Sequence, residues 1–128
     1  MLNNLLLIAL GGAVGASARF LTVEAVVRRL GVEFPYGTLV VNILGSFAMG
    51  LLVGALARFL PENATAMRSF FAVGVLGSYT TFSTFSLDVV TLMERGQVWQ
   101  AGGYIAVSLA ACVLGLILGL LVWRAFPA

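Results

Sequence analysis

Residues 77–86 read GSYTTFSTFS and lie near the centre of the third of four long apolar segments. Glycine permits backbone dihedrals outside the helical region, and serine and threonine hydroxyls can bond backbone groups that a helix break sets free. A membrane tolerates non-helical backbone only where it is buried in protein or lines a cavity. The stretch therefore predicts a broken third helix, with the interruption at Gly77–Thr81, beside a cavity or an ion site.

The composition around this stretch is that of a membrane protein. Of the 128 residues, 61% are hydrophobic and 9% are charged, whereas a soluble domain carries roughly 25% charged residues. The mean hydropathy is +1.08. A helix crosses the hydrocarbon core with about 20 residues. We therefore predict an all-α membrane protein of one domain, residues 1–128, whose four transmembrane helices span about 2–27, 36–60, 67–93 and 98–126.

The first segment contains a feature of secretory signals. Residues 16–18 read Ala-Ser-Ala, which resembles a signal cleavage site after an apolar run. No lysine or arginine precedes the run, however, and small residues recur in it at the four-residue spacing that brings membrane helices close together, as in Gly11 and Gly15. We therefore expect the segment to be a packed membrane helix.

Basic residues are nearly balanced between the two sides of the predicted bundle. Three arginines lie on the side of the termini (Arg58, Arg68 and Arg124), and three lie on the other side (Arg28, Arg29 and Arg95). Arg19 would add a fourth to the second group. Because an excess of basic residues normally fixes the cytoplasmic side, the near-balance leaves two alternatives. Another feature sets the orientation, or the chain inserts in both directions and pairs as an antiparallel dimer.

A break at Gly77–Thr81 would present two kinds of polar group. The first half-helix would end in unpaired carbonyls, which suit a hard cation such as Na⁺. The second would begin with free amides, which together with hydroxyls suit an anion. The alternative is a helix merely distorted by serine and threonine, with no ion bound.

Other side chains in the spans allow both structural and functional interpretations. Phe82 and Phe85 share a helix face and are either packing residues or ring edges that an anion contacts. Asn42 either bridges two helices or donates to a passing anion. Tyr104 and Ser108 lie one helical turn apart. Their hydroxyls either form a polar stripe along the helix or bond to neighbouring helices.

Two charges, Arg19 and Asp88, lie well inside the spans. Arg19 is a functional candidate by default, since intramembrane charges are costly, but it is near enough to the end of its span to extend to the interface. Asp88 follows Phe85 by one turn and either stabilises a helix contact or faces a vestibule. The sequence has no histidine and no nucleophile beside a base, so we do not expect an enzyme.

Three ordered motifs resemble those of the Fluc (CrcB) family of fluoride channels: GGAVGASARF at 11–20, GTLVVNILGSF at 37–47, and GSYTTFSTF at 77–85. The resemblance covers essentially the whole chain. It implies a fluoride-selective passive channel that lets fluoride leave the cell, built as an antiparallel, dual-topology homodimer in the bacterial inner membrane. The partners that it implies are fluoride, a second copy of the chain and membrane lipid, with no nucleic acid.

The resemblance also implies roles for individual residues. Carbonyls of Gly77 and Thr80 would hold a central Na⁺ that is structural and not transported. The expected pore and fluoride-binding residues are Asn42, Phe82, Ser83, Thr84, Phe85, Tyr104 and Ser108. Two positions depart from the family pattern. Cys112 replaces a hydroxyl that would continue the track of Tyr104 and Ser108, and Asp88 stands where the family often has glutamate.

Two other function classes fit a small four-helix membrane protein less well. A proton-coupled dual-topology multidrug transporter needs a membrane-embedded carboxylate, typically in the first span, and residues 5–20 contain none. A passive bundle or accessory subunit has no need of a hydroxyl-rich break or of Asn42 inside a span.

Overall fold

The computed structural model describes residues 1–60, 62 and 64–126. Two helices precede the broken span, α1 (Leu2–Leu30) and α2 (Tyr36–Phe59). The broken span consists of α3 (Thr65–Met67), the π-helix η1 (Arg68–Leu76), α4 (Gly77–Tyr79) and α5 (Phe82–Glu94), and α6 (Val98–Arg124) follows it. Four helices in the described residues are long and apolar enough to cross a membrane, which confirms the prediction of a multi-pass, all-helical protein.

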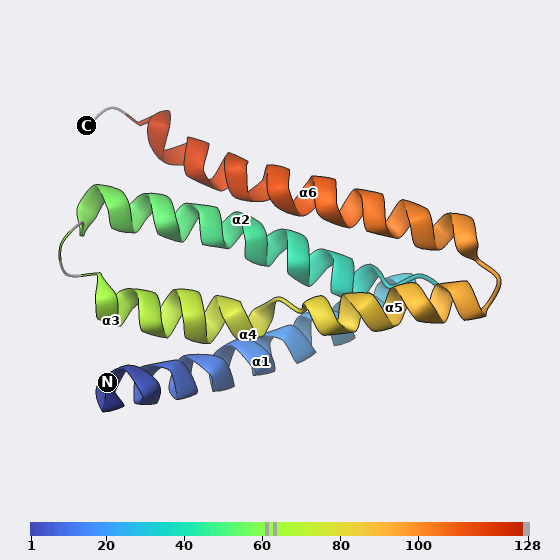
Figure 1. Cartoon of the computed structure of the whole chain (residues 1–128), viewed down its shortest axis with the longest axis horizontal. Coiled ribbons are helices and arrows are strands. Elements are labelled where there is room, and N and C mark those ends of the chain that lie inside the picture. Colours follow the sequence, from blue (N-terminus) through green and yellow to red (C-terminus); the bar gives the residue numbers. More distant parts are fainter. Residues whose placement is uncertain (61, 63, 127–128) are drawn as a thin grey trace.

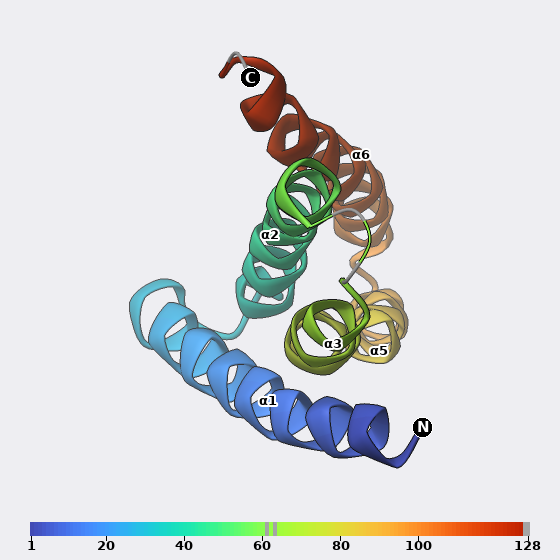
Figure 2. The ribbon, with the colours of Figure 1, turned by 90° about the vertical axis from the view of Figure 1, so that its left-hand side faces the viewer.

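The four spans run back and forth along one long axis (Figure 1). The first and last described residues lie at the same end, as an even number of spans requires. Seen along that axis in Figure 2, α2 lies against α6, and α1 passes obliquely beneath the third span. The closest packing is between α2 and α6 and between α1 and η1. The other half of the third span, α5, contacts α6, so the third span joins α1 to the α2–α6 pair.

Glycines allow both of these close contacts. A Cβ at Gly11 or Gly15 on α1 would overlap backbone atoms of η1, and a Cβ at Gly50 or Gly119 would do the same between α2 and α6. The four-residue glycine spacing therefore has the packing role that the sequence predicted. Many large apolar side chains are exposed on the outer faces of the helices; Leu10, for example, is 62% exposed.

The predicted break in the third span is confirmed, at the C-terminal end of the predicted interval. Thr80 (φ −83°, ψ 158°) and Thr81 (φ −150°, ψ 113°) are extended and separate α4 from α5. The unwound link is visible between the two helices in Figure 1. The π-helical turns over Arg68–Leu76 were not predicted; such turns often lie at functional sites.

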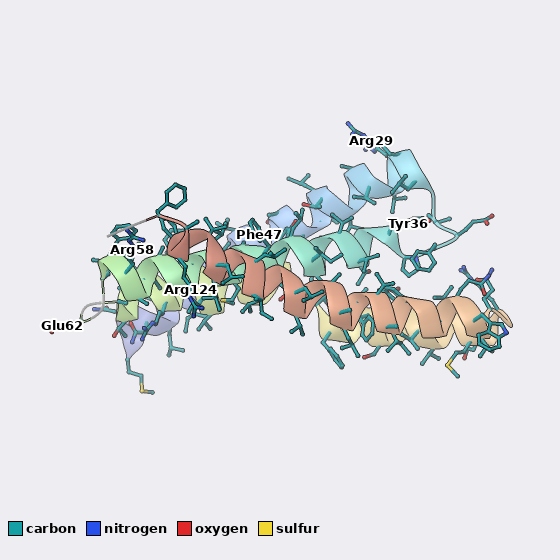
Figure 3. The ribbon with its side chains drawn as sticks, turned by 90° about the horizontal axis from the view of Figure 1, so that it is seen from above. Arg29, Tyr36, Phe47, Arg58, Glu62 and Arg124 are labelled. Carbon is teal, nitrogen blue, oxygen red and sulfur yellow. The ribbon has the colours of Figure 1, made fainter. Side chains whose placement is uncertain are left out.

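Arginines lie toward both ends of the molecule. Arg58 and Arg124 lie at the end that also carries the chain termini, and Arg29 lies toward the opposite end (Figure 3). Arg58 donates to the carbonyls of Trp123 (2.7 Å) and Phe126 (2.6 Å) and so stabilises the C-terminal end of α6. Arginines are therefore present at both ends of the bundle, as the predicted near-balance of basic residues requires.

Candidate functional site

The polar groups freed by the break are bound by one side chain from α2. The backbone N–H of Thr81 donates to Asn42 Oδ1 (2.8 Å), and Asn42 Nδ2 donates to the Thr81 carbonyl (3.1 Å). The amide of Asn42 therefore pairs with both backbone groups of Thr81, as a neighbouring peptide would. Of the two interpretations of Asn42, the structure shows the helix bridge, and Asn42 also faces a cavity.

Thr81 begins α5. Its Oγ1 accepts from the backbone N–H of Thr84 (3.2 Å) and donates to the hydroxyl of Thr84 (3.0 Å). This is an N-cap: a hydroxyl satisfies an amide that has no partner in the first turn. The sequence analysis did not select Thr81 individually, although a threonine directly before an apolar helical segment is a recognisable N-cap signal.

A cavity of about 250 Å³ opens beside the break. Several of the polar and aromatic residues selected from the sequence meet there, although they come from different helices. The lining residues are Asn42, Ser46, Thr80, Thr81, Phe82, Phe85, Ser108, Leu109, Cys112 and Val113. Four of the seven predicted pore residues are among them, from α2, α5 and α6. The structure therefore brings together residues that are 66 positions apart in the sequence, Asn42 and Ser108.

The two phenylalanines of α5 have different environments. Phe82 is 74% exposed, whereas Phe85 is 8% exposed. Their ring centroids are 5.5 Å apart. The ring of Phe85 also packs against Tyr104 at 5.1 Å, with the ring planes inclined by 56°. Phe85 is therefore packed against neighbours within the chain, while most of Phe82 is exposed.

Tyr104 lies behind this wall of the cavity and does not line it. It is 1% exposed, and its hydroxyl donates to Asp88 Oδ2 at 2.9 Å, which links α6 to α5. Asp88 thus has the helix-contact role, one of its two predicted alternatives. Ser83 and Thr84 lie in the exposed first turn of α5, outside the residues that line the cavity.

The carbonyls predicted to hold a cation are at the break. In a continuous helix the N–H of Thr81 would donate to the Gly77 carbonyl, but it donates to Asn42 instead, so Gly77 loses its usual partner. The Thr80 carbonyl lies in extended backbone and accepts a long contact, 3.5 Å, from Arg19 Nη1. Carbonyl oxygens are the ligand type that a hard cation prefers, and two of them are fewer than such a cation usually takes.

Arg19 lies beside the broken span. Its guanidinium lies half-buried against the broken span and contacts the Thr80 carbonyl. A break attracts such a group because the carbonyls that end a half-helix carry partial negative charge. Arg19 and any cation bound at the break would share the same oxygen.

Six of the lining residues were absent from the predicted pore set: Ser46, Thr80, Thr81, Leu109, Cys112 and Val113. Ser46, one turn after Asn42 on α2, and Cys112 and Val113 on α6 line the cavity. Ser108 Oγ is buried, and it has no hydrogen-bond partner among the described residues. The i, i+4 spacing of Asn42 with Ser46 and of Ser108 with Cys112 is the signal that would have found two of them.

Together these groups can contact a small anion. The lining supplies an amide, hydroxyls and two phenylalanine rings, and the N-terminal end of α5 adds partial positive charge. No acid–base pair or nucleophile with a base lies among the lining residues of this part of the chain. The lining offers groups that can bind an ion.

We predict that Asn42→Ala destabilises the protein by roughly 2–6 kcal/mol, because it leaves two backbone groups of Thr81, the N–H and the carbonyl, without partners away from water, at roughly 1–3 kcal/mol each. The measurement is reversible unfolding in detergent micelles. Ser17→Ala is the matched control, since that exposed hydroxyl donates only within its own helix, to the Ala13 carbonyl. Equal stability of the two variants would show that the Asn42 bonds contribute nothing.

Comparison with known proteins gives one family. The model of the family described as "CrcB-like protein, Camphor Resistance (CrcB)" matches residues 6–120. A relative from Chelativorans sp., "Fluoride-specific ion channel FluC", is 54% identical over 118 residues, which cover 91% of this chain and 93% of the relative. Relatives of the same name from Cereibacter sphaeroides (46% identical, 100% of both chains) and Sphingopyxis alaskensis (47% identical, 99% of this chain and 100% of the relative) also match.

The names of these relatives are those of ion channels and not of enzymes, in agreement with the expectation from the sequence. The matches extend over nearly the whole length of the chain and include all three motifs. The resemblance predicted from those motifs is thereby confirmed, and the chain belongs to the CrcB family.

Proposed function

We propose that the protein is a fluoride-selective passive channel that lets fluoride leave the cell down its electrochemical gradient and so reduces its toxicity. The observation that carries the proposal is the cavity beside the break, where Asn42, Phe82, Phe85 and Ser108 meet. The names of the relatives, "Fluoride-specific ion channel FluC", support fluoride as the ion. The proposed location is the bacterial inner membrane.

The chemistry of the cavity suits fluoride. Fluoride is small and strongly hydrated, so a pore must replace its water shell with other donors. Asn42 and Ser108 supply donor groups, and the phenylalanine edges supply partial positive charge without a full charge that would trap the ion. Binding strong enough for entry and weak enough for exit is what conduction requires.

The proposed pore extends beyond the cavity of a single chain. Ser83 and Thr84 lie in the exposed first turn of α5, next to Phe82, where they would line the same path. Tyr104 would act from behind, since it packs on Phe85 and is fixed by its bond to Asp88. Ser108, a buried residue of α6 that lines the cavity, would continue the same path.

We further propose that the working unit is an antiparallel, dual-topology homodimer. Exposed hydroxyls in the middle of a span, such as Ser83 and Thr84, are unfavourable against lipid and favourable in a helix–helix contact. The 74% exposure of Phe82 has the same implication for a ring that is to contact an ion. The near-balance of arginines favours insertion in both orientations.

An antiparallel partner would also complete the proposed structural Na⁺ site. Gly77 and Thr80 offer two carbonyl oxygens in each chain, and two chains related by a two-fold axis would offer four. A bound Na⁺ would neutralise the partial negative charge of these carbonyls and hold the two breaks together. Arg19, already at the Thr80 carbonyl, adds positive charge on the same side of the break.

The function is tested by efflux. Purified protein in liposomes loaded with fluoride should release it rapidly into a fluoride-free medium, and chloride-loaded liposomes should release their ion far more slowly. An ion-selective electrode measures both. Absence of fluoride release from an intact dimer would overturn the channel, and equal chloride release would overturn its selectivity.

Replacing either pore phenylalanine should slow fluoride release without preventing assembly, since isoleucine removes the ring edge and keeps apolar bulk. Phe82→Ile should leave stability nearly unchanged because Phe82 is exposed, whereas Phe85→Ile also loses packing on Tyr104. The control is Phe20→Ile, an exposed phenylalanine of α1 that does not line the cavity. Release at the wild-type rate from both pore variants would remove the ring-edge argument.

Dual topology predicts that one population of protein shows both orientations in the cell membrane. A tag joined to the C terminus should be reached by an impermeant reagent from the periplasmic side in about half of the molecules, since the charge near-balance favours neither orientation. Permeabilised cells give the total. Labelling of all molecules, or of none, before permeabilisation would exclude the antiparallel dimer.

A further inference from the structure

Cys112 lies on the wall of the cavity. It follows Ser108 by one helical turn on α6, so the two side chains share a face, and both line the cavity together with Ser46 of α2. The thiol is free and partly exposed. A cysteine placed on a cavity wall, unlike one packed in a core, can be reached by a small molecule that enters the cavity.

A second observation at the same place indicates that the cavity can take a ligand. Ser108 is 6% exposed, and its Oγ has no hydrogen-bond partner among the described residues. A buried hydroxyl without a partner costs free energy, which a ligand or water with a polar atom can recover. Cys112 is therefore next to a polar group that is available for bonding.

We propose that Cys112 is a modification site, at which a small, neutral, thiol-reactive electrophile becomes attached inside the cavity and obstructs it. The obstruction of ion flux rests on the proposed function, whereas the modification itself does not. The site would confer on this chain a sensitivity to thiol-directed chemistry that a hydroxyl at the same position lacks.

The properties of the cavity define the class of reagent. Its volume, about 250 Å³, corresponds to roughly eight waters at about 30 Å³ each. Phe82, Leu109 and Val113 make much of the wall apolar, so a bulky charged reagent would lose more hydration than the few donors of the wall can replace. A compact neutral reagent should therefore react faster than a charged one of similar size.

Methyl methanethiosulfonate is a suitable probe, and its reaction is balanced without a further oxidant. The thiol proton passes to water, and the thiolate sulfur attacks the methylthio sulfur of the reagent. A new S–S bond forms between Cys112 and the methylthio group. The S–S bond of the reagent breaks, and methanesulfinate leaves with the electron pair.

The first arm of the experiment measures modification alone. Folded protein in liposomes is treated with methyl methanethiosulfonate, and intact-mass spectrometry counts the added methylthio groups. We expect one group on each chain, and none on Cys112→Ser. Denatured protein shows the full reactivity of the thiol. A folded chain that stays unmodified while the denatured chain reacts completely would overturn the proposed site.

The second arm measures fluoride release before and after modification, each variant against its own untreated rate. We expect a several-fold decrease for the native chain, recovery on reduction with dithiothreitol, and no change for Cys112→Ser. Complete modification with an unchanged rate would overturn the obstruction. If the untreated native chain releases no fluoride, the proposed channel function fails and the obstruction with it, while the mass measurement still decides the modification site.

A matched control separates the cavity from the rest of α6. Leu114 is 57% exposed and does not line the cavity, and it lies about 200° around the helix from Cys112. In a Cys112→Ser background, Leu114→Cys should be modified without any decrease in its own rate of fluoride release. A decrease equal to that of the native chain would show that the effect is not specific to the cavity.

Discussion

The structure depends on one constraint: backbone polar groups that a helix break releases inside a membrane must find partners in the protein, since lipid offers none. Here Thr81 is the residue at risk. Both of its backbone groups pair with the side chain of Asn42, and its own hydroxyl caps the next half-helix. Each unsatisfied group would cost roughly 1–3 kcal/mol. The extended link therefore persists because α2 presents an amide of matching geometry.

Other features of the bundle make room for this arrangement and hold it in place. A Cβ at Gly45 of α2 would overlap the side chain of Thr80, so the absence of a side chain there lets the link approach. On the other side, Tyr79 donates to the hydroxyl of Thr22 on α1 at 3.1 Å. The two halves of the third span then diverge in their contacts: η1 packs on α1, and α5 packs on α6. Each half is fixed by a different neighbour.

The sequence predicts the break in the third span but not the contacts that hold it. The break followed from the dense Gly, Ser and Thr content near Gly77, because composition alone makes a continuous membrane helix unfavourable there. That Asn42 bridges helices was one of two predicted roles, but its pairing with both groups of Thr81 depends on the relative position of two helices. The local sequence did not predict the π-helix at Arg68–Leu76. Its backbone lies in close contact with Gly11 and Gly15 of α1, a tertiary contact that the local sequence does not encode. Arg19 was placed by distance along the chain, whereas its contact with Thr80 depends on tertiary structure.

The break also separates two kinds of polar environment within one short segment. The carbonyls at the end of the first half-helix carry partial negative charge, and the guanidinium of Arg19 on α1 lies against one of them, the Thr80 carbonyl. The cavity has its walls on α2, α5 and α6, and the N-terminal end of α5 at Phe82 has the opposite polarity. A continuous helix has no such pair of ends at membrane depth. A segment with a partial negative helix end and a partial positive helix end at membrane depth therefore requires the interruption, and the bonds of Asn42 to Thr81 stabilise that interruption.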